Sequence, residues 1–144
     1  MTTPETINSH NPLSVPWRHR IIIHVTAGFA GLLATLKPVC LRQILLTVRR
    51  GARHATHAET LAVRQRLVAV SLVCTGPQSC LARSIAVALL CRINGSWPTW
   101  CTGVRRIPPF GAHAWVEAEG RSVGEPYPDG YHVTMLSVPP AANR

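Results

Sequence analysis

The sequence predicts an α+β fold, in which a helical N-terminal half precedes a small antiparallel sheet. Apolar residues recur with helical spacing as far as Asn94-Gly95, and after that point they occur in short runs separated by turn residues. Residues 79–92 contain an unbroken apolar run, Ile85 to Cys91, which predicts a buried helix. With 144 residues, 47% of them apolar, the chain is expected to form a single domain over residues 1–144 with a core of its own.

The helical part is predicted to span residues 17–74, after a polar tail at 1–16 that contains three prolines and is expected to be disordered. Its first helix covers Ile21–Leu36, sixteen residues, whereas a membrane span needs roughly 20. This length favours a helix packed closely on another helix, with membrane contact as the alternative. One helical face carries large residues and the rest carries small ones: Ile22, Val25, Phe29, Leu32 and Leu36 against Ala27, Gly28, Ala30, Gly31 and Ala34.

Two more helices are predicted before the central one. Pro38 in a first turn and Gly51 after the end define a helix over 39–50. Thr56 and Glu59 form a capping box, which starts a helix that runs to about Cys74.

The basic cluster between these two helices, Arg49 to His57, is interpreted as a solvated loop. The less favoured alternative is a binding site for an acidic peptide or phosphate. His54 and His57 have no further ligands nearby, so no metal site is predicted.

The C-terminal part, residues 75–138, is predicted to consist of the central helix and four short strands, followed by a tail at 139–144. Turn signals at Gly120 and at Asp129-Gly130 separate the later strands. The strands are expected at 100–106, 112–117, 121–126 and 131–138.

The composition bounds the partners and the compartment. The net charge is +9, from 15 Lys and Arg against 6 Asp and Glu, which suggests an acidic partner: nucleic acid, membrane headgroups or an acidic peptide. Five cysteines are an odd number and none forms a Cys-x-x-Cys pair, so neither a disulfide framework nor a zinc site is indicated. The N-terminus carries Pro4, Glu5 and Pro12 where a secretory signal needs charge and then an apolar run, which favours a reducing cytoplasm.

Cys80 is the candidate nucleophile. Ser79 is a suitable N-cap after the loop 75–78, so Cys80 falls at the first helical position. The unpaired amides and the positive end of the helix dipole favour the thiolate there. The alternative is that Cys80 is a small buried apolar residue. For an oxyanion, the backbone amide of Cys80 is the first candidate donor and the side chain of Gln78 the second.

His113 is the candidate base, and the acid that orients it can be sought by register. A three-residue loop at 118–120, with its glycine left-handed, places Glu125 directly opposite His113, with Cβ atoms about 5 Å apart. A two-residue Glu-Gly loop would turn Glu125 to the other face of the sheet. Asp129 is the alternative acid, although its place in a turn favours a structural role. Trp115 and Tyr127 either flank the site or are ordinary sheet aromatics.

Three segments of the sequence resemble a known family: Ser-Cys-Leu-Ala-Arg-Ser-Ile-Ala at 79–86, Gly-Val-Arg-Arg at 103–106, and Pro-Phe-Gly-Ala-His-Ala-Trp-Val-Glu at 109–117. They are similar to the lasso-peptide leader peptidases, transglutaminase-like cysteine proteases of lasso-peptide gene clusters. The resemblance implies a papain- or transglutaminase-like core without a cofactor, with Cys80 as nucleophile and His113 as base. The third residue in this family is usually Asp, and Glu125 is taken to hold that place.

The resemblance also implies a function. Such an enzyme removes the leader from a ribosomally made precursor before a separate enzyme closes the macrolactam ring. The chain is too short to include a winged-helix leader-recognition module, so a small separate recognition protein is the expected partner, with the cyclase as another candidate. An acyl transferase with the same three residues is the alternative enzyme. A basic protein that binds nucleic acid or membrane is the alternative from another class, although the resemblance implies no nucleic-acid partner.

Overall fold

The computed structural model describes residues 15–76 and 78–142. The predicted N-terminal tail lies outside the described residues except for its last two, and of these Val15 is buried in the core. The first two residues of the predicted C-terminal tail are bound to the rest of the protein. Nη1 of Arg49 donates hydrogen bonds to the backbone carbonyls of Pro139 and Pro140.

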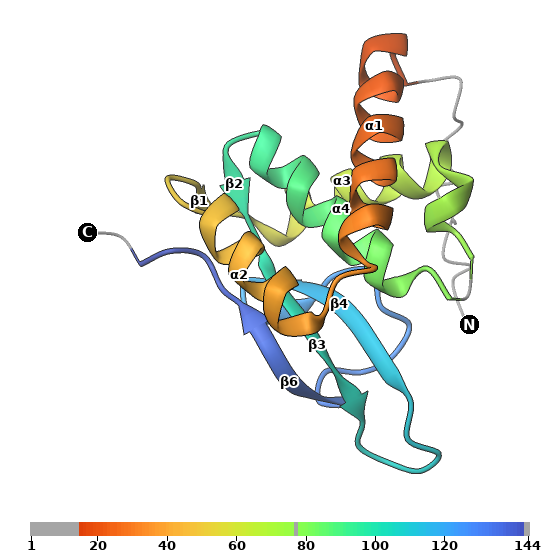
Figure 1. Cartoon of the computed structure of the whole chain (residues 1–144), viewed down its shortest axis with the longest axis vertical. Coiled ribbons are helices and arrows are strands. Elements are labelled where there is room, and N and C mark those ends of the chain that lie inside the picture. The colour runs from red at the N-terminus through yellow and green to blue at the C-terminus, as the bar shows by residue number, and fades with distance from the viewer. Residues whose placement is uncertain (1–14, 77, 143–144) are drawn as a thin grey trace, which may run out of the picture.

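The α+β class is confirmed. Within the described ranges the chain forms four α-helices and then a small antiparallel sheet (Figure 1). A three-residue 3₁₀-helix at Leu72–Cys74 follows the third helix, so that helix ends earlier than its predicted limit at Cys74. The α-helices are α1 Trp17–Leu33, α2 Pro38–Val48, α3 His57–Val70 and α4 Cys80–Ile93.

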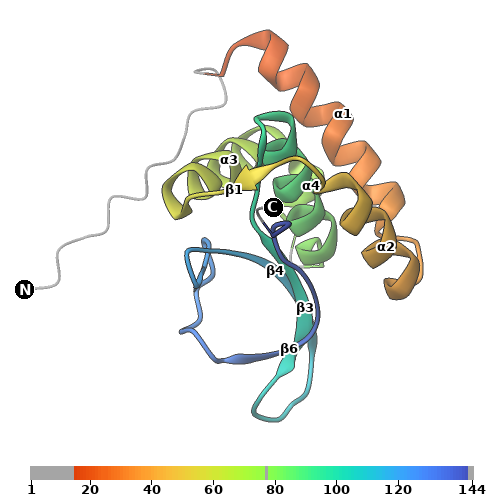
Figure 2. The ribbon, with the colours of Figure 1, turned by 90° about the vertical axis from the view of Figure 1, so that its left-hand side faces the viewer.

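The sheet has four strands in the order β5-β4-β3-β6, with every neighbouring pair antiparallel. A separate two-residue parallel pair, β1 Arg53–His54 with β2 Ser96–Trp97, was not predicted. The helices lie on one side of the sheet, which curls away from them (Figure 2). The strands of the sheet are β3 Thr99–Arg105, β4 Ala112–Ala118, β5 Arg121–Ser122 and β6 His132–Val138.

Helix α4 is the centre of the core, as its apolar run predicts. Every residue from Ser84 to Cys91 is buried, with α1 and α3 packed against it on the helical side and β4 on the other. Nε1 of Trp100 in β3 donates a hydrogen bond to Oγ of Ser84, at 3.1 Å, which fixes the strand against the helix. The first turn of α4 is thereby held at a set position relative to β4.

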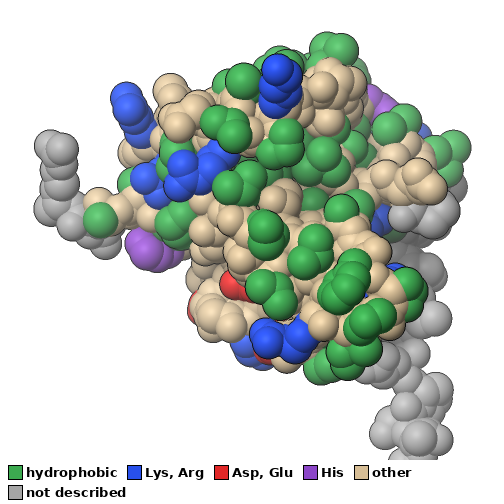
Figure 3. Space-filling view, turned by 60° about the horizontal axis from the view of Figure 1, so that its bottom comes forward, with side chains coloured by type: hydrophobic (Ala, Val, Ile, Leu, Met, Phe, Trp, Pro, Cys, Tyr) green, Lys and Arg blue, Asp and Glu red, His purple; other side chains and the backbone are tan. Residues whose placement is uncertain are grey.

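Helix α1 packs on α4 through its small side, with Ala27 and Ala30 buried, in agreement with the predicted close helix packing. Two of its large apolar residues, Ile23 and Leu33, are buried as well, and the others point outward. No helix in the described part of the chain is both long and apolar enough to cross a membrane. On the face drawn in Figure 3, exposed apolar side chains are widespread and acidic ones are few. The exposed apolar residues of α1 and of the connection after it are Trp17, Ile21, Ile22, Val25, Phe29, Leu32 and Leu36.

The predicted register after β4 is wrong. Glu117 pairs with Ser122, so the loop has the two residues Glu119 and Gly120, not three. Both have positive φ, 53° and 75°, which is the backbone of a tight turn that suits the twist of antiparallel strands. The predicted strand at 121–126 is also too long, since β5 ends at Ser122.

One glycine is required where β3 and β6 approach. A Cβ on Gly103 would overlap the backbone carbonyl of Val133, and the strand register shifts between Thr102 and Gly103. Gly103 pairs with His113 of β4, so this close approach lies beside the candidate site.

Candidate active site

Cys80 is the first residue of α4, as predicted. Ser79 occupies the N-cap position, but its hydroxyl donates to the carbonyl of Gly76 at 2.5 Å and does not cap the helix. No acidic residue lies in the first turn. The first amides of α4 therefore have no capping side chain, and they remain free to stabilise negative charge at the half-buried thiol.

The pKa of the Cys80 thiol is lowered. The largest cause is its hydrogen bond with the imidazole of His113, and the backbone amides of Ala114 and Leu81 add to it against the opposing effect of burial. Burial instead raises the pKa of Cys91 and of Cys101 to about 12. Among these thiols only Cys80 is shifted toward the reactive thiolate.

His113 lies in β4 between Cys80 and Glu125. Its Nε2 is 2.7 Å from Oε2 of Glu125, and the two side chains are only 17% and 8% exposed. The hydrogen bonds with Cys80 and then Glu125 raise the pKa of His113 to about 9. In the tautomer that a base needs here, Nε2–H donates to the carboxylate of Glu125. Nδ1 is then left to exchange a proton with the thiol.

Glu125 thus meets His113 by a route different from the predicted one. Continued strand pairing in the observed register would turn Glu125 to the opposite face of the sheet. Val123 still follows that register, because its amide bonds to the carbonyl of Val116 at 3.0 Å. Gly124 then adopts a φ of 68°, which redirects the chain. The expected partner is in place, but a turn at Gly124, rather than cross-strand pairing, puts it there.

Asp129, the alternative acid, is bound elsewhere. Its Oδ1 accepts hydrogen bonds from the hydroxyl of Ser122 at 2.8 Å and from the amide of the same residue at 3.2 Å. These bonds lower the pKa of Asp129, whose side chain is exposed. The structure therefore joins Cys80, His113 and Glu125, and it gives Asp129 a role in bracing the loop after β5.

Aromatic rings surround His113. Trp115 stacks on it at a centroid distance of 5.9 Å, and His132 of β6 stacks at 4.5 Å. Tyr127 stacks on Tyr131, and both meet the edge of the His132 ring. Trp115 therefore contacts the candidate base directly, whereas Tyr127 reaches it only through His132.

Sequence reasoning missed His132. Burial and the neighbouring His113 lower the pKa of His132, so it favours the neutral form beside a His113 that favours the charged one. No motif marks this residue. Its strand, β6, is separated from β4 by β3, and only the fold brings the two rings together.

Arg64 of α3 is a second residue that the sequence did not assign. A Cβ on Gly124 would lie 2.7 Å from Cδ of Arg64, so the arginine stem packs directly on the turn that carries Glu125. Burial and the charge of Arg83 lower the pKa of Arg64, while Glu125 opposes this. Arg64 and Arg83 line the same small cavity as Glu125, which gives the carboxylate a positive environment.

Gln78 is exposed in the loop before α4, so its proposed role as an oxyanion donor stays a prediction. Across residues 15–76 and 78–142 no three His, Cys, Asp or Glu side chains are grouped so that they could hold a metal.

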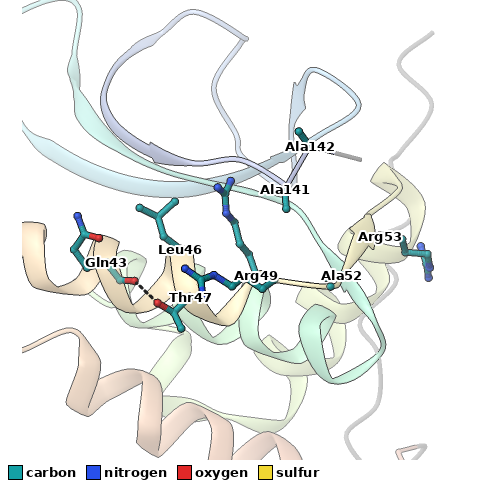
Figure 4. Close-up of a pocket in the computed structure, with 10 residues that line it drawn as sticks. Gln43, Leu46, Thr47, Arg49, Ala52, Arg53, Ala141 and Ala142 are labelled. Carbon is teal, nitrogen blue, oxygen red and sulfur yellow. Dashed lines mark hydrogen bonds between the residues drawn. The ribbon is translucent and has the colours of Figure 1, made fainter. Parts of the chain in front are cut away.

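Two larger cavities flank different parts of the fold. One, of about 330 Å³, has Cys80 and His113 in its wall. The other, of about 1030 Å³, lies between α2, the segment that follows it and the C-terminal segment (Figure 4). Arg49, Arg50 and Arg53 line this second cavity, but Arg53 is paired with Glu59 and Arg49 bonds to backbone carbonyls. It contains no nucleophile or base of the candidate site.

The family comparison covers most of the chain. The model of the transglutaminase-like superfamily matches residues 23–137. No curated protein and no solved structure gives a significant match. The matched range includes all three residues of the candidate site.

Proposed function

This chain belongs to the transglutaminase-like superfamily, and from that premise we propose that it is a cysteine peptidase. Cysteine-dependent acyl chemistry is typical of the superfamily. The observation that carries the proposal is the 2.7 Å hydrogen bond between His113 and Glu125, in a site where His113 lowers the pKa of the Cys80 thiol and lines the same cavity as Cys80. A nucleophile, a base and an orienting acid in this order are the minimum set for covalent catalysis at a carbonyl.

The first half-reaction forms an acyl-enzyme. The Cys80 thiolate attacks the carbonyl carbon of the scissile bond, and the amide at the N-terminus of α4 stabilises the resulting oxyanion. Nδ1 of His113 then gives its proton to the departing amine as the C–N bond breaks. Glu125 holds the ring by Nε2 and stabilises the imidazolium before that transfer.

The second half-reaction releases the product. His113 takes a proton from water through the same Nδ1, and the hydroxide adds to the thioester carbonyl. The C–S bond breaks and returns the thiolate, whose partner is again an imidazolium. An amine in place of water would make the enzyme an acyl transferase, which is the second candidate function because the same three residues serve both reactions.

We propose further that the substrate is the precursor of a lasso peptide and that the product is the precursor without its leader. The motifs at 79–86 and 109–117 support this finer assignment. A small leader-recognition protein is the proposed partner, the macrolactam-forming cyclase is another, and the exposed apolar residues of α1 are the proposed docking surface. The five cysteines are free in the structure, and a reducing compartment favours this state, so we propose the cytoplasm as the place of the reaction.

Mass spectrometry of the cognate precursor, incubated with this protein and the recognition protein in heavy-oxygen water, tests the function. Hydrolysis should release leader whose new carboxylate carries one heavy oxygen atom, and Cys80→Ala should release none. Leader that appears only joined to an added amine would favour the acyl transferase. Salt-dependent binding of DNA or liposomes that is unchanged in Cys80→Ala, without cleavage, would favour the basic binding protein.

A further inference from the structure

The cavity beside Cys80 has an apolar wall that the cleavage steps do not use. It has a volume of about 330 Å³ and is lined by α2 and the residues before it, the start of α4 and the three long strands. None of the described residues that line it is Lys, Arg, Asp or Glu. Apart from Cys80 and His113, its principal walls are Leu41, Leu81, Trp100, Thr102, Ala114 and Leu136.

The floor of this cavity is rigid and its mouth is adaptable. Leu41 is 1% exposed and Trp100 is 0% exposed, and the Trp100 indole is fixed by its hydrogen bond to Ser84. Met135 at the rim is 67% exposed, and a flexible thioether side chain can close over ligands of different shapes. The cavity is therefore formed before any ligand enters.

The position of the cavity decides what reaches it. A peptide whose carbonyl carbon lies at the Cys80 sulfur passes the cavity mouth, because Cys80 and His113 form part of the wall. Its volume of about 330 Å³ lies at the low end of the roughly 300–1,000 Å³ that is usual for small-ligand pockets. The cavity therefore has room for about one large side chain and not for a folded segment. Water in an apolar cavity finds few hydrogen-bond partners, and an apolar group displaces it favourably.

We propose that this cavity is a specificity pocket, which receives a large apolar side chain of the peptide substrate next to the scissile bond. The inference rests on the proposed peptidase function and names the class of peptide that the enzyme selects. A charged side chain at that position would lose its hydration without gaining a partner. Peptides with Leu or Phe at one side of the cleaved bond are therefore good substrates, and those with Asp or Lys there are poor ones.

The pocket can be probed without a substrate through the rate of Cys80 alkylation. Iodoacetamide and N-phenethyl-iodoacetamide are compared, and the exposed Cys40 of the same chain supplies the reference for a thiol without a pocket. The phenethyl reagent should gain at least about tenfold at Cys80 over Cys40, because one methylene in a fitted apolar pocket already contributes about 10–200-fold. Equal ratios at the two cysteines would overturn the proposal.

Two variants at the pocket locate the effect. Thr102→Phe puts a ring into the cavity and should abolish the advantage of the phenethyl reagent over iodoacetamide at Cys80. Thr134→Phe is the matched control, because Thr134 is exposed on β6 and does not line the cavity. Labelling of the buried Cys74 or Cys91 would report misfolding. In that event Met135→Glu, at the exposed rim, takes the place of Thr102→Phe and should remove the same advantage.

Precursor peptides with Leu, Ala or Asp in turn on each side of the scissile bond complete the test. Wild type should prefer Leu over Asp by about 10–200-fold in kcat/KM, and Thr102→Phe should prefer Ala. Cleavage without preference, together with equal reagent ratios, would overturn the pocket and leave the peptidase standing. Reagent selectivity at Cys80 without cleavage of any peptide would contradict the peptidase and leave the pocket in place.

Discussion

Helices α4 and α1 are both apolar in sequence and pack against each other, yet α4 is enclosed from Ser84 to Cys91 whereas α1 buries only one side. The buried side of α1 includes Ala27 and Ala30. Most of its large apolar residues face outward, with Phe29 51% exposed, although Ile23 and Leu33 are buried. Small residues on α1 let the two helices approach closely, and this leaves most of the bulky residues of α1 without a partner among the described elements.

The difference shows that apolar content does not fix burial. Burial depends on the elements that surround a helix. Helix α4 has helices on one side and strand β4 on the other, whereas the main neighbours of α1 among the described elements are the helices α4 and α3. The enclosed part of α4 packs on β4, and this packing places its first residue, Cys80, in the same cavity wall as His113. A helix with one free apolar side is suited to contact another molecule.

Removal of the thiol at the start of α4 should have the largest effect. Cys80→Ala is expected to lower the rate of leader removal by about 10³–10⁶-fold, since nucleophile and base act as a unit. His113→Ala should be nearly as damaging, and the double variant scarcely worse. Cys40→Ala, at an exposed cysteine of α2, is the matched control and should keep full activity. Leader removal at the wild-type rate by Cys80→Ala would end the peptidase proposal.

The acid behind His113 should have the next largest effect. Glu125→Gln keeps the shape of the side chain but removes the charge that stabilises imidazolium, and a loss of about 10–10³-fold in turnover is expected, less than the roughly 10⁴-fold of a serine triad. Asp129→Asn is the matched control, with a mild effect because Asn-Gly forms the same turn as Asp-Gly. A large loss at Asp129 with normal turnover at Glu125 would reverse the assignment of the acid.

The pH profile separates the charge of Glu125 from its shape. The pKa of His113 is raised to about 9, so the imidazolium persists below that pH and is lost above it, and activity should fall on the alkaline side near 9. Glu125 contributes to this raised pKa, and Glu125→Gln should therefore move the alkaline limb to lower pH. An unmoved limb would mean that Glu125 does not act through His113.

Much of this frame could be predicted from local sequence signals. The helix starts at Pro38 and at Thr56 were found, and Thr56 does accept the Glu59 amide at 3.2 Å. The contact of Glu125 with His113 was expected for the wrong reason. A glutamate in left-handed conformation at position 119 is uncommon, so the sequence favoured the longer loop.

The remainder depends on contacts between distant segments. The β1–β2 pair joins residues 53–54 with 96–97, and the stacking of His132 on His113 crosses a whole strand. The sequence predicts Arg64 to be a surface residue of its helix. It lies near Glu125 in the structure because the chain turns at Gly124. Such contacts leave no periodic signal in one sequence.

Stability measurements can test the contrast between the two helices with one kind of substitution. Ile85 in α4 is 0% exposed, so Ile85→Ala should lower the free energy of unfolding by about 2–5 kcal/mol. Ile21 in α1 is 52% exposed, and Ile21→Ala should change it by only about 0.5 kcal/mol. Denaturant titration of both variants gives the comparison. Equal losses would mean that α1 is covered in the protein as it exists in solution.

Ile22→Lys in α1 should have the smallest effect on stability but a specific effect on partner-stimulated leader removal. Ile22→Lys replaces an exposed apolar residue and should leave the free energy of unfolding within about 0.5 kcal/mol of wild type. Ile93→Lys, at the exposed last residue of α4, is the matched control, and lysine at a helix C-terminus is well tolerated.

If α1 docks the recognition protein, Ile22→Lys should lose the stimulation that this protein gives to leader removal, because a desolvated charge opposes binding. The rate without the partner should stay unchanged, and Ile93→Lys should be stimulated like wild type. Full stimulation of Ile22→Lys and of Phe29→Lys would show that the free side of α1 serves another purpose.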